Sequence, residues 1–308
     1  MGYLDGKAIV ITGSGGGIGA AYARHAAREG ARVVVNDIDA ASAHSVVAAI
    51  RAEGGTASAH VASVASWAGA AGLIADCVET YGGIDGLVNN AAVFHMALPE
   101  EEDEAGLRAL IEVNLLGTMF CGIHASRHML ARGRGAIVNV TSGAQAGLGR
   151  QGAYGASKGA VASLTYSWAI DMGARGVRVN AVSPMARSRM ADQAQQYLAE
   201  HGHAPWPAMA ATPEDNTPVV VYLLSDRSAA VNGQVVRIDG KRLALMTHPA
   251  VLDPPLRRDA WTVQNVADAF EQQLVARQLP LGVVALEAQV RAYALDYDNT
   301  AGAGPVVG

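Results

Sequence analysis

The sequence predicts an α/β fold in which a parallel sheet of about seven strands is covered by helices on both faces. Short runs of valine, isoleucine and leucine alternate with alanine-rich stretches of helical length over roughly the first 240 residues. These runs lack the polar alternation of a half-exposed strand, and such strands are typical of parallel sheets buried on both faces. Half of the residues are hydrophobic and 17% are charged, so the chain can form a core of this size.

The predicted elements follow one another as a strand–helix repeat. Strands are expected at residues 7–13, 31–37, 56–63, 84–92, 135–142, 177–184 and 233–240. Helices are expected at residues 17–30, 43–54, 67–82, 100–130 and 153–176. The stretch 100–130 is a long helix or a broken pair, with Pro99 in its first turn and the acidic run Glu100–Glu104 at the positive end of its dipole.

Charge, cysteine content and histidine spacing exclude several classes of partner. The formal net charge is −5 without any basic run, so we expect no nucleic-acid surface. Cys77 and Cys121 have no metal-ligand spacing, and we expect reduced, buried thiols in a cytoplasmic protein. His124 and His128 lie one helical turn apart without a carboxylate or thiol partner, so we expect no metal. No signal peptide and no uncharged run of membrane-spanning length are found, so we expect no membrane partner.

A glycine-rich turn predicts a dinucleotide site. The segment "TGSGGGIG", Thr12–Gly19, follows the first strand and opens the first helix. Glycines allow the backbone to approach a pyrophosphate, which the free N–H groups of a helix N-terminus attract. Asp37 ends the second strand about twenty residues on, where a carboxylate accepts hydrogen bonds from the ribose and repels a 2′-phosphate. Ile38 follows it, not Arg or Lys, so we expect NAD over NADP; the alternative, a helix-capping role, suits Asp39 better.

The segment "YGASK" predicts the chemistry. Tyr154 and Lys158 are four residues apart and share one face of a helix. A lysine ammonium near a phenol lowers the pKa of the phenol, which can then exchange a proton with an alcohol or ketone while a hydride moves to or from nicotinamide. Ser142, at the end of the fifth strand, would hold the substrate oxygen. Taken singly, these residues could be a core aromatic, a surface cation and a strand-end cap.

These motifs, in this order, resemble the short-chain dehydrogenase/reductase family over roughly residues 5–240, with "NNAA" at Asn89–Ala92 as a further match. The resemblance implies a doubly wound Rossmann-type fold, with Tyr154 as the acid/base and Lys158 on the nicotinamide ribose. It also implies that Asn114 holds a water in a proton relay. The cofactor contacts that it implies are Gly13, Ser14, Gly17, Ile18, Gly19, Asp37, Ile38, Ser63, Val64, Asn90, Ala91, Tyr154, Lys158, Pro184, Met185 and Ser188.

Three departures from the family pattern matter. Ser63 stands where the family usually has an aspartate on the adenine. The serine-to-tyrosine spacing is one residue short, so Thr141 falls at the usual offset; we choose Ser142 by aligning the strand, and the alternative stays open. Pro184–Met185 replaces the usual Pro-Gly, and "SPMARSRM" is similar to the (3R)-hydroxyacyl-CoA dehydrogenase module of peroxisomal multifunctional enzyme type 2, which also oxidises some 17β-hydroxysteroids with NAD.

The segment from about 185 to 216 is the substrate lid that the resemblance implies. Its apolar side chains are Met185, Met190, Tyr197, Trp206 and Met209. They favour a hydrophobic secondary alcohol or ketone, hydroxysteroid-like or 3-hydroxyacyl-like, although they could simply pack the lid on the body. The alternatives are small cyclic or aromatic alcohols, or a non-catalytic dinucleotide sensor; sensors of this fold commonly lose the tyrosine or the lysine, and this chain keeps both.

The chain is expected to divide after residue 245. Residues 246–308 would form an extension with a proline-rich linker, a helix at 262–279 and a tail. An apolar run, Leu279–Leu286, predicts that this extension docks on the core or on a neighbouring subunit. The family resemblance implies a homo-oligomer, with a tetramer favoured and a dimer possible.

Overall fold

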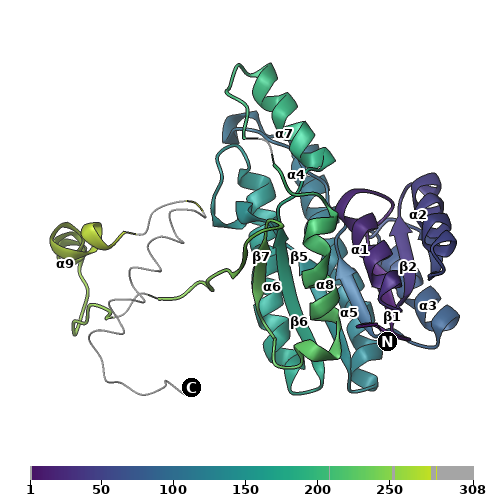
Figure 1. The fold of residues 1–308 in the computed structure, drawn as a ribbon. Coiled ribbons are helices and arrows are strands. Elements are labelled where there is room, and N and C mark those ends of the chain that lie inside the picture. Colours follow the sequence, from purple (N-terminus) through teal and green to yellow (C-terminus); the bar gives the residue numbers. More distant parts are fainter. Residues whose placement is uncertain (1, 208, 252–253, 279–281, 283–308) are drawn as a thin grey trace. The chain divides into compact units, whose positions relative to one another are not determined.

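The computed structural model describes residues 2–207, 209–251, 254–278 and 282, and the fold is drawn in Figure 1. The chain divides into two units, Met1–Met246 and Thr247–Gly308. The domain boundary predicted from the sequence, after residue 245, lies beside this division. The apolar run Leu279–Leu286 and the tail lie outside the described residues, apart from Gly282.

The first unit is built on one sheet of eight strands in the order β3-β2-β1-β4-β5-β6-β7-β8. The strands are β1 (Ala8–Ile11), β2 (Arg32–Asp37), β3 (Thr56–Val61), β4 (Gly86–Asn89), β5 (Gly135–Val140), β6 (Val177–Pro184), β7 (Val235–Ile238) and β8 (Leu243–Leu245). The first seven are parallel, which confirms the predicted doubly wound sheet. The eighth pairs antiparallel with β7 and was not predicted, because its three residues are exposed and carry no core pattern.

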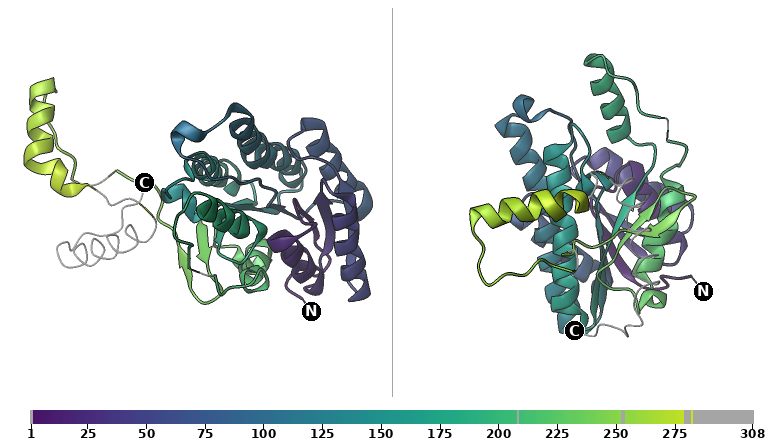
Figure 2. Two further views of the ribbon diagram at one scale, coloured as in Figure 1. Left: turned by 90° about the horizontal axis from the view of Figure 1, so that it is seen from above. Right: turned by 90° about the vertical axis from the view of Figure 1, so that its left-hand side faces the viewer.

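Helices form a layer on each face of the sheet, as Figures 1 and 2 show. They are α1 (Gly17–Arg28), α2 (Ala40–Ala52), α3 (Trp67–Tyr81), α4 (Glu104–Leu110), α5 (Gly117–Ala131), α6 (Gly152–Gly173), α7 (Arg189–Glu200) and α8 (Thr217–Leu224). One core cluster joins the sheet to α1, α2 and α8, and a second joins the opposite face to α3, α5 and α6. The strands are therefore buried on both sides, which is why they read as uninterrupted apolar runs.

The stretch predicted as a long helix or a broken pair is broken. A short 3₁₀ turn (Pro99–Glu101) precedes α4, and a π-helical segment, Ile111–Leu116, separates α4 from α5. Pro99 therefore begins the 3₁₀ turn, while Asp103 caps α4 by accepting from the amide of Gly106 at 2.8 Å. Glu104–Ala131 is long and apolar enough to cross a membrane by length and composition alone, a test that the core helices of soluble proteins also pass.

In the second unit, a capping box at Thr262 begins α9 (Val263–Ala269). A π-helical segment (Phe270–Leu274) and a 3₁₀ turn (Val275–Arg277) continue it. The helix predicted at 262–279 is thus present over its described part.

The order in which the chain adds strands to the sheet reverses between β1 and β4. From β1 the chain adds β2 and β3 on one side, and from β4 it adds β5, β6 and β7 on the other. The loops that follow β1 and β4 therefore diverge, and a crevice opens at the carboxyl ends of these strands, where open α/β sheets bind ligands.

Candidate active site

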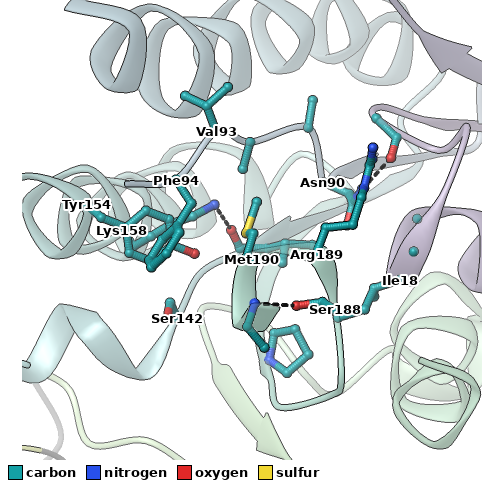
Figure 3. A pocket seen from close by; sticks show the side chains of 18 of the residues that line it. Ile18, Asn90, Val93, Phe94, Ser142, Tyr154, Lys158, Ser188, Arg189 and Met190 are labelled. Carbon is teal, nitrogen blue, oxygen red and sulfur yellow. Dashed lines mark hydrogen bonds between the residues drawn. The ribbon is translucent and has the colours of Figure 1, made fainter. Parts of the chain in front are cut away.

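A cavity of about 580 Å³ lies at this edge of the sheet (Figure 3). It brings together nineteen of the residues predicted from the sequence: Gly13, Gly17, Ile18, Gly19, Asp37, Ile38, Ser63, Val64, Asn90, Ala91, Ser142, Tyr154, Lys158, Pro184, Met185, Ser188, Met190, Trp206 and Met209. Three predicted residues, Ser14, Asn114 and Tyr197, do not line it. Figure 3 shows Phe94, Tyr154 and Lys158 together at one end, with Ile18 and Asn90 at the other.

The glycine-rich loop has no room for side chains at two of its positions, Gly13 and Gly19. Gly13 has φ +59°, and a Cβ there would lie 2.7 Å from the Cα of Ala91. A Cβ on Gly19 would clash with the carbonyl oxygen of Gly13 and would lie 2.5 Å from Nδ2, the side-chain nitrogen of Asn90. Only glycine fits these contacts, so the loop stays flat at the start of α1 and leaves a cradle of the kind that a dinucleotide pyrophosphate requires.

Ser14 and Asn90 hold this loop in place. The Ser14 hydroxyl, fully buried, donates to the carbonyl of Ile11 at 2.7 Å, which explains why it does not face the cavity. The Asn90 side chain donates to the carbonyls of Thr12 and Gly13 at 3.0 and 2.9 Å. The structure therefore places Asn90 as a support of the loop as well as a lining residue.

Asp37 faces the cavity at the end of β2. Its Oδ2 accepts from the Gly15 amide at 2.9 Å and its Oδ1 from the Asp39 amide at 3.1 Å. Asp39, not Asp37, caps α2, by accepting from the amide of Ser42 at 2.6 Å. The partly exposed Asp37 carboxylate is thus oriented by the glycine loop itself. Together with the cradle, these groups fit the pyrophosphate and the ribose of a nicotinamide dinucleotide.

Tyr154 lies at the other end of the cavity, in the first turn of α6. Its ring packs edge-on against Phe94 with 4.9 Å between the ring centroids. Burial raises the pKa of its phenol to about 12, while a hydrogen bond with the Ser142 side chain acts in the opposite direction. The phenol is therefore neutral at pH 7 and shares its site with the serine hydroxyl.

Lys158 lies one turn further along α6, with its ammonium buried. Its Nζ donates to the carbonyl of Val140 at 2.9 Å and lies 5.8 Å from the centroid of the Tyr154 ring. Burial lowers the pKa of this ammonium to about 8. The expected lowering of the phenol pKa by the lysine is not what the structure gives: burial is the largest influence on Tyr154, and it raises the pKa.

We expect the Lys158→Met variant to be more stable than the wild type at neutral pH. The shift from 10.5 to about 8 corresponds to roughly 3 kcal/mol of buried-charge cost. Loss of the bond to Val140 offsets part of it, so we expect a gain of about 1–3 kcal/mol in the free energy of unfolding. The cost of the charge is fully present below about pH 8 and is lost as the pH rises through 10.5, so the difference between the two proteins should shrink over that window.

Urea unfolding at several pH values measures this difference. Lys241→Met, at an exposed lysine, is the matched control and should change the stability by less than about 0.5 kcal/mol. A Lys158→Met protein that is less stable than the wild type at pH 7 would contradict the expectation.

Thr141 and Ser142 have different surroundings. The Thr141 hydroxyl is buried, and its single proton is shared between two acceptors, Oε1 of Gln145 at 2.7 Å and the carbonyl of Lys158 at 3.0 Å. The Ser142 hydroxyl accepts from the amide of Ala144 at 3.2 Å and bonds with Tyr154. This geometry favours Ser142 as the hydroxyl that meets a substrate.

Asn114 lies in the π-helical segment and is fully buried. Its side chain accepts from the Val93 amide at 2.8 Å and donates to the Val93 carbonyl at 3.0 Å and to Ser157 Oγ at 3.1 Å. Its backbone carbonyl accepts from the Thr118 hydroxyl at 2.8 Å. The structure shows Asn114 joining the loop after β4 to α6 behind the cavity; its part in a proton relay stays a prediction.

The segment predicted as a lid forms α7 and the loop that follows it. Ser188 caps α7, and Gln195 is bonded to both backbone groups of Trp206, which joins the helix to the loop. Met190 and Trp206 line the cavity. Tyr197 was predicted with them, but its hydroxyl donates to Glu101 at 2.9 Å and its ring stacks on His201.

Phe94, Arg189 and Arg237 are among the lining residues that were not predicted. Phe94 lies just after the "NNAA" segment, and an aromatic residue at that position was the feature of the sequence that could have identified it. Arg189 begins α7, with its Nη2 3.6 Å from the position of a Cβ on Gly16. Arg237 interrupts the apolar strand β7, and a charge within such a strand was the signal that could have identified it.

The described parts of the chain contain no group of three His, Cys, Asp or Glu side chains that could hold a metal ion. Cys77 and Cys121 are free and buried, and burial raises the pKa of each thiol to about 12.

Comparison with known proteins agrees with this geometry. A family model described as enoyl-(acyl carrier protein) reductase matches residues 13–240. The 2-(S)-hydroxypropyl-CoM dehydrogenase 3 of Xanthobacter autotrophicus is 36% identical over 251 residues, which are 79% of this chain and 98% of that protein. A short chain dehydrogenase from Mycobacterium avium superposes with a TM-score of 0.78 at 36% identity, covering 89% of this chain and 96% of that one.

A second solved structure is a gluconate 5-dehydrogenase from Burkholderia cenocepacia in complex with NADP and tartrate. It has a TM-score of 0.67 and 32% identity and covers 77% of this chain and 95% of that one. With the glycine loop, Ser142, Tyr154 and Lys158 gathered at one cavity, the chain belongs to the short-chain dehydrogenase/reductase family, whose members are oxidoreductases that bind a nicotinamide dinucleotide.

Proposed function

We propose that this protein is an NAD-dependent dehydrogenase that interconverts a largely apolar secondary alcohol and its ketone. The observation that carries the proposal is one cavity with Asp37 and the glycine cradle at one end and Ser142, Tyr154 and Lys158 at the other. A non-catalytic sensor would need only the first half of this arrangement.

Each catalytic side chain has a separate role in the proposed reaction. The hydroxyls of Ser142 and Tyr154 hold the substrate oxygen, and Tyr154 exchanges the proton of that oxygen. Lys158, whose buried ammonium lies 5.8 Å from the centroid of the Tyr154 ring, would hold the nicotinamide ribose of a bound cofactor. A bound nicotinamide dinucleotide supplies the hydride acceptor or donor. The surrounding apolar walls exclude water from the reacting groups.

Asp37 supports the choice of NAD. Its carboxylate, held by the amides of Gly15 and Asp39, would stand against a 2′-phosphate. The structure of the similar gluconate 5-dehydrogenase contains NADP. Titration of this protein with NAD and with NADP therefore decides between the two cofactors.

The lining of the substrate end supports an apolar alcohol. Phe94, Leu148, Met190, Trp206 and Met209 line the cavity, as suits a hydroxysteroid, a 3-hydroxyacyl chain or a cyclic alcohol. The relatives named above act on a hydroxypropyl-CoM and on gluconate, both of which are secondary alcohols.

The test is an absorbance assay at the reduced-nicotinamide band, with NAD and NADP offered separately to a panel of secondary alcohols and ketones. Turnover with NAD on members of the panel supports the proposal. Tight binding of NAD by calorimetry, with no turnover on any of them, would favour the sensor and contradict an enzyme.

We also propose a cytoplasmic homo-oligomer, a tetramer by preference, to which the extension after Met246 docks. The free thiols Cys77 and Cys121 support a reducing compartment. Ile170, on the outer face of α6, is 81% exposed, and Leu107 and Ile111 are exposed on and just after α4, as an apolar interface would require.

We expect light scattering to give a mass several times 31.7 kDa for the intact chain and a smaller mass for Ile170→Glu, because a carboxylate in an apolar interface is costly. Val61→Glu, at an exposed valine of the outer strand β3, is the matched control and should keep the mass. A monomeric wild type would contradict the proposed assembly. A chain ending at Met246 shows whether the extension contributes to it.

A further inference from the structure

Gln151 is a buried polar residue whose side-chain amide has no hydrogen-bond partner within the described part of the chain. It is 5% exposed and lines the same cavity as Ser142 and Tyr154. It occupies the N-cap position of α6, yet its side chain makes no capping bond, and none of the described residues bonds to its amide. Buried polar groups are almost always paired, so an unpaired amide beside a cavity requires an explanation.

Other polar side chains buried in the same lining are bonded to the chain itself. Asn36 donates to two backbone carbonyls, each at 3.0 Å. The Thr141 hydroxyl and the Lys158 ammonium also bond to backbone carbonyls, at 3.0 and 2.9 Å. Gln151 therefore differs from these polar groups, whose bonds are satisfied without a ligand.

The backbone fixes the position from which the Gln151 side chain starts. Arg150 precedes it with φ +62°, a left-handed conformation that residues other than glycine rarely adopt. The amide of Ala97 donates to the carbonyl of Arg150 at 3.0 Å, and the carbonyl of Gln151 accepts from the amide of Gly155 at 2.6 Å. These bonds hold the turn on both sides of the glutamine.

Gln151 lies close to the phenol that exchanges the proton in the proposed reaction. Tyr154 follows it by three residues, and side chains with this spacing at the start of a helix are neighbours, with Cβ atoms about 5–6 Å apart. A side-chain amide offers N–H donors and an acceptor oxygen without a net charge, so it suits a carbonyl or a hydroxyl oxygen. An amide at this distance from the phenol can reach an oxygen on a carbon one or two bonds away from the reacting carbon.

We infer that Gln151 determines specificity and that the substrate carries a second neutral oxygen, a carbonyl or a hydroxyl, one or two carbons from the reacting alcohol. The inference rests on the proposed function and narrows it: the substrate is a hydroxy carbonyl compound or a diol with an otherwise apolar body, not a simple alcohol. A site with a buried amide discriminates against a substrate that leaves this amide unpaired. The competing roles for Gln151 are packing alone and a contact with the carboxamide of the nicotinamide.

Substrate pairs that differ in the second oxygen test this inference. Cyclohexane-1,2-diol is assayed beside cyclohexanol, and ethyl 3-hydroxybutanoate beside 2-heptanol, which has the same chain length. We expect the wild type to favour the oxygenated member of each productive pair in kcat/KM by roughly 10- to 100-fold, as for one buried hydrogen bond. Gln151→Met keeps an unbranched side chain and removes the amide, so the ratio should fall to about one, mainly through a higher KM of the oxygenated member.

Gln193→Met makes the same chemical change at an exposed glutamine of α7, outside the cavity lining, and should keep the wild-type ratio. An unchanged ratio in Gln151→Met would overturn the inference while leaving the dehydrogenase intact. Equal losses on both members of each pair would overturn it as well. Calorimetric titration of NAD would then separate a lost cofactor contact, which weakens NAD binding, from lost packing. If no pair reduces NAD at all, the proposed reaction fails, and the inference fails with it.

Discussion

Replacing Tyr154 with phenylalanine should lower the turnover of the true substrate by a factor of about 10²–10⁴, the usual cost of losing a general acid/base. The substitution removes only the phenolic oxygen and keeps the ring that packs edge-on against Phe94. NAD binding should survive, because the glycine loop and Asp37 lie at the other end of the cavity.

The pH dependence separates proton transfer from packing in this variant. Burial raises the pKa of Tyr154 to about 12, so the fraction of phenolate in the free enzyme rises with pH throughout the working range. Oxidation of the alcohol by the wild type should therefore accelerate between about pH 6 and 8, and the residual rate of Tyr154→Phe should lose this dependence.

Two further variants serve as controls for the position of the substrate oxygen. Ser142→Ala should slow turnover, because it removes the hydroxyl that bonds with Tyr154. Thr141→Ala should have less effect, since its hydroxyl is committed to Gln145 and to the Lys158 carbonyl. Near-normal turnover of Tyr154→Phe on the true substrate would refute the proton-transfer role.

The parts of this protein that the sequence predicted are those with local signals. The buried parallel strands show uninterrupted apolar runs, and the helix face of Tyr154 and Lys158 follows from their spacing. The glycine loop was recognisable because its shape forbids side chains at Gly13 and Gly19. Each of these signals lies within a few residues of the feature it predicts.

The features that were missed depend on contacts between distant segments. The sequence left open whether residues 100–130 form a long helix or a broken pair, because the break contains Asn114, whose amide bonds to the backbone of the distant Val93. Tyr197 turns to Glu101 because the chain brings α7 beside that residue. The pKa of Tyr154 follows its burial, which a spacing of four residues from a lysine does not reveal.

The second large effect concerns the choice of cofactor. Asp37→Ser should narrow the preference for NAD over NADP by a factor on the order of 10³. Two like charges roughly 4 Å apart at an effective dielectric near 20 repel by about 4 kcal/mol, which is close to a thousandfold in a dissociation constant. Most of the change should be a gain in NADP affinity, because serine removes the repulsion and keeps a hydrogen-bonding group for the ribose.

A cation beside the loop strengthens this expectation. The Arg189 guanidinium lies 3.6 Å from the position of a Cβ on Gly16. The pKa of Asp39 is lowered mainly by its hydrogen bonds with Ser42, and the charge of Arg189 adds a smaller contribution. In Asp37→Ser the carboxylate that repels a 2′-phosphate is removed. The phosphate could then bind the Arg189 guanidinium without that repulsion.

Asp39→Ser is the matched control, because it makes the same chemical change two residues away and keeps a side chain that caps α2. Asp39 also lines the cavity and lies near Arg189, so this variant should shift the preference between NAD and NADP in the same direction, but by far less than Asp37→Ser. Calorimetric titration of NAD and NADP into the wild type and both variants measures all six dissociation constants. A wild type that binds NADP as tightly as NAD would refute the role of Asp37, since its carboxylate, already held by the amides of Gly15 and Asp39, could not then be facing the 2′ position.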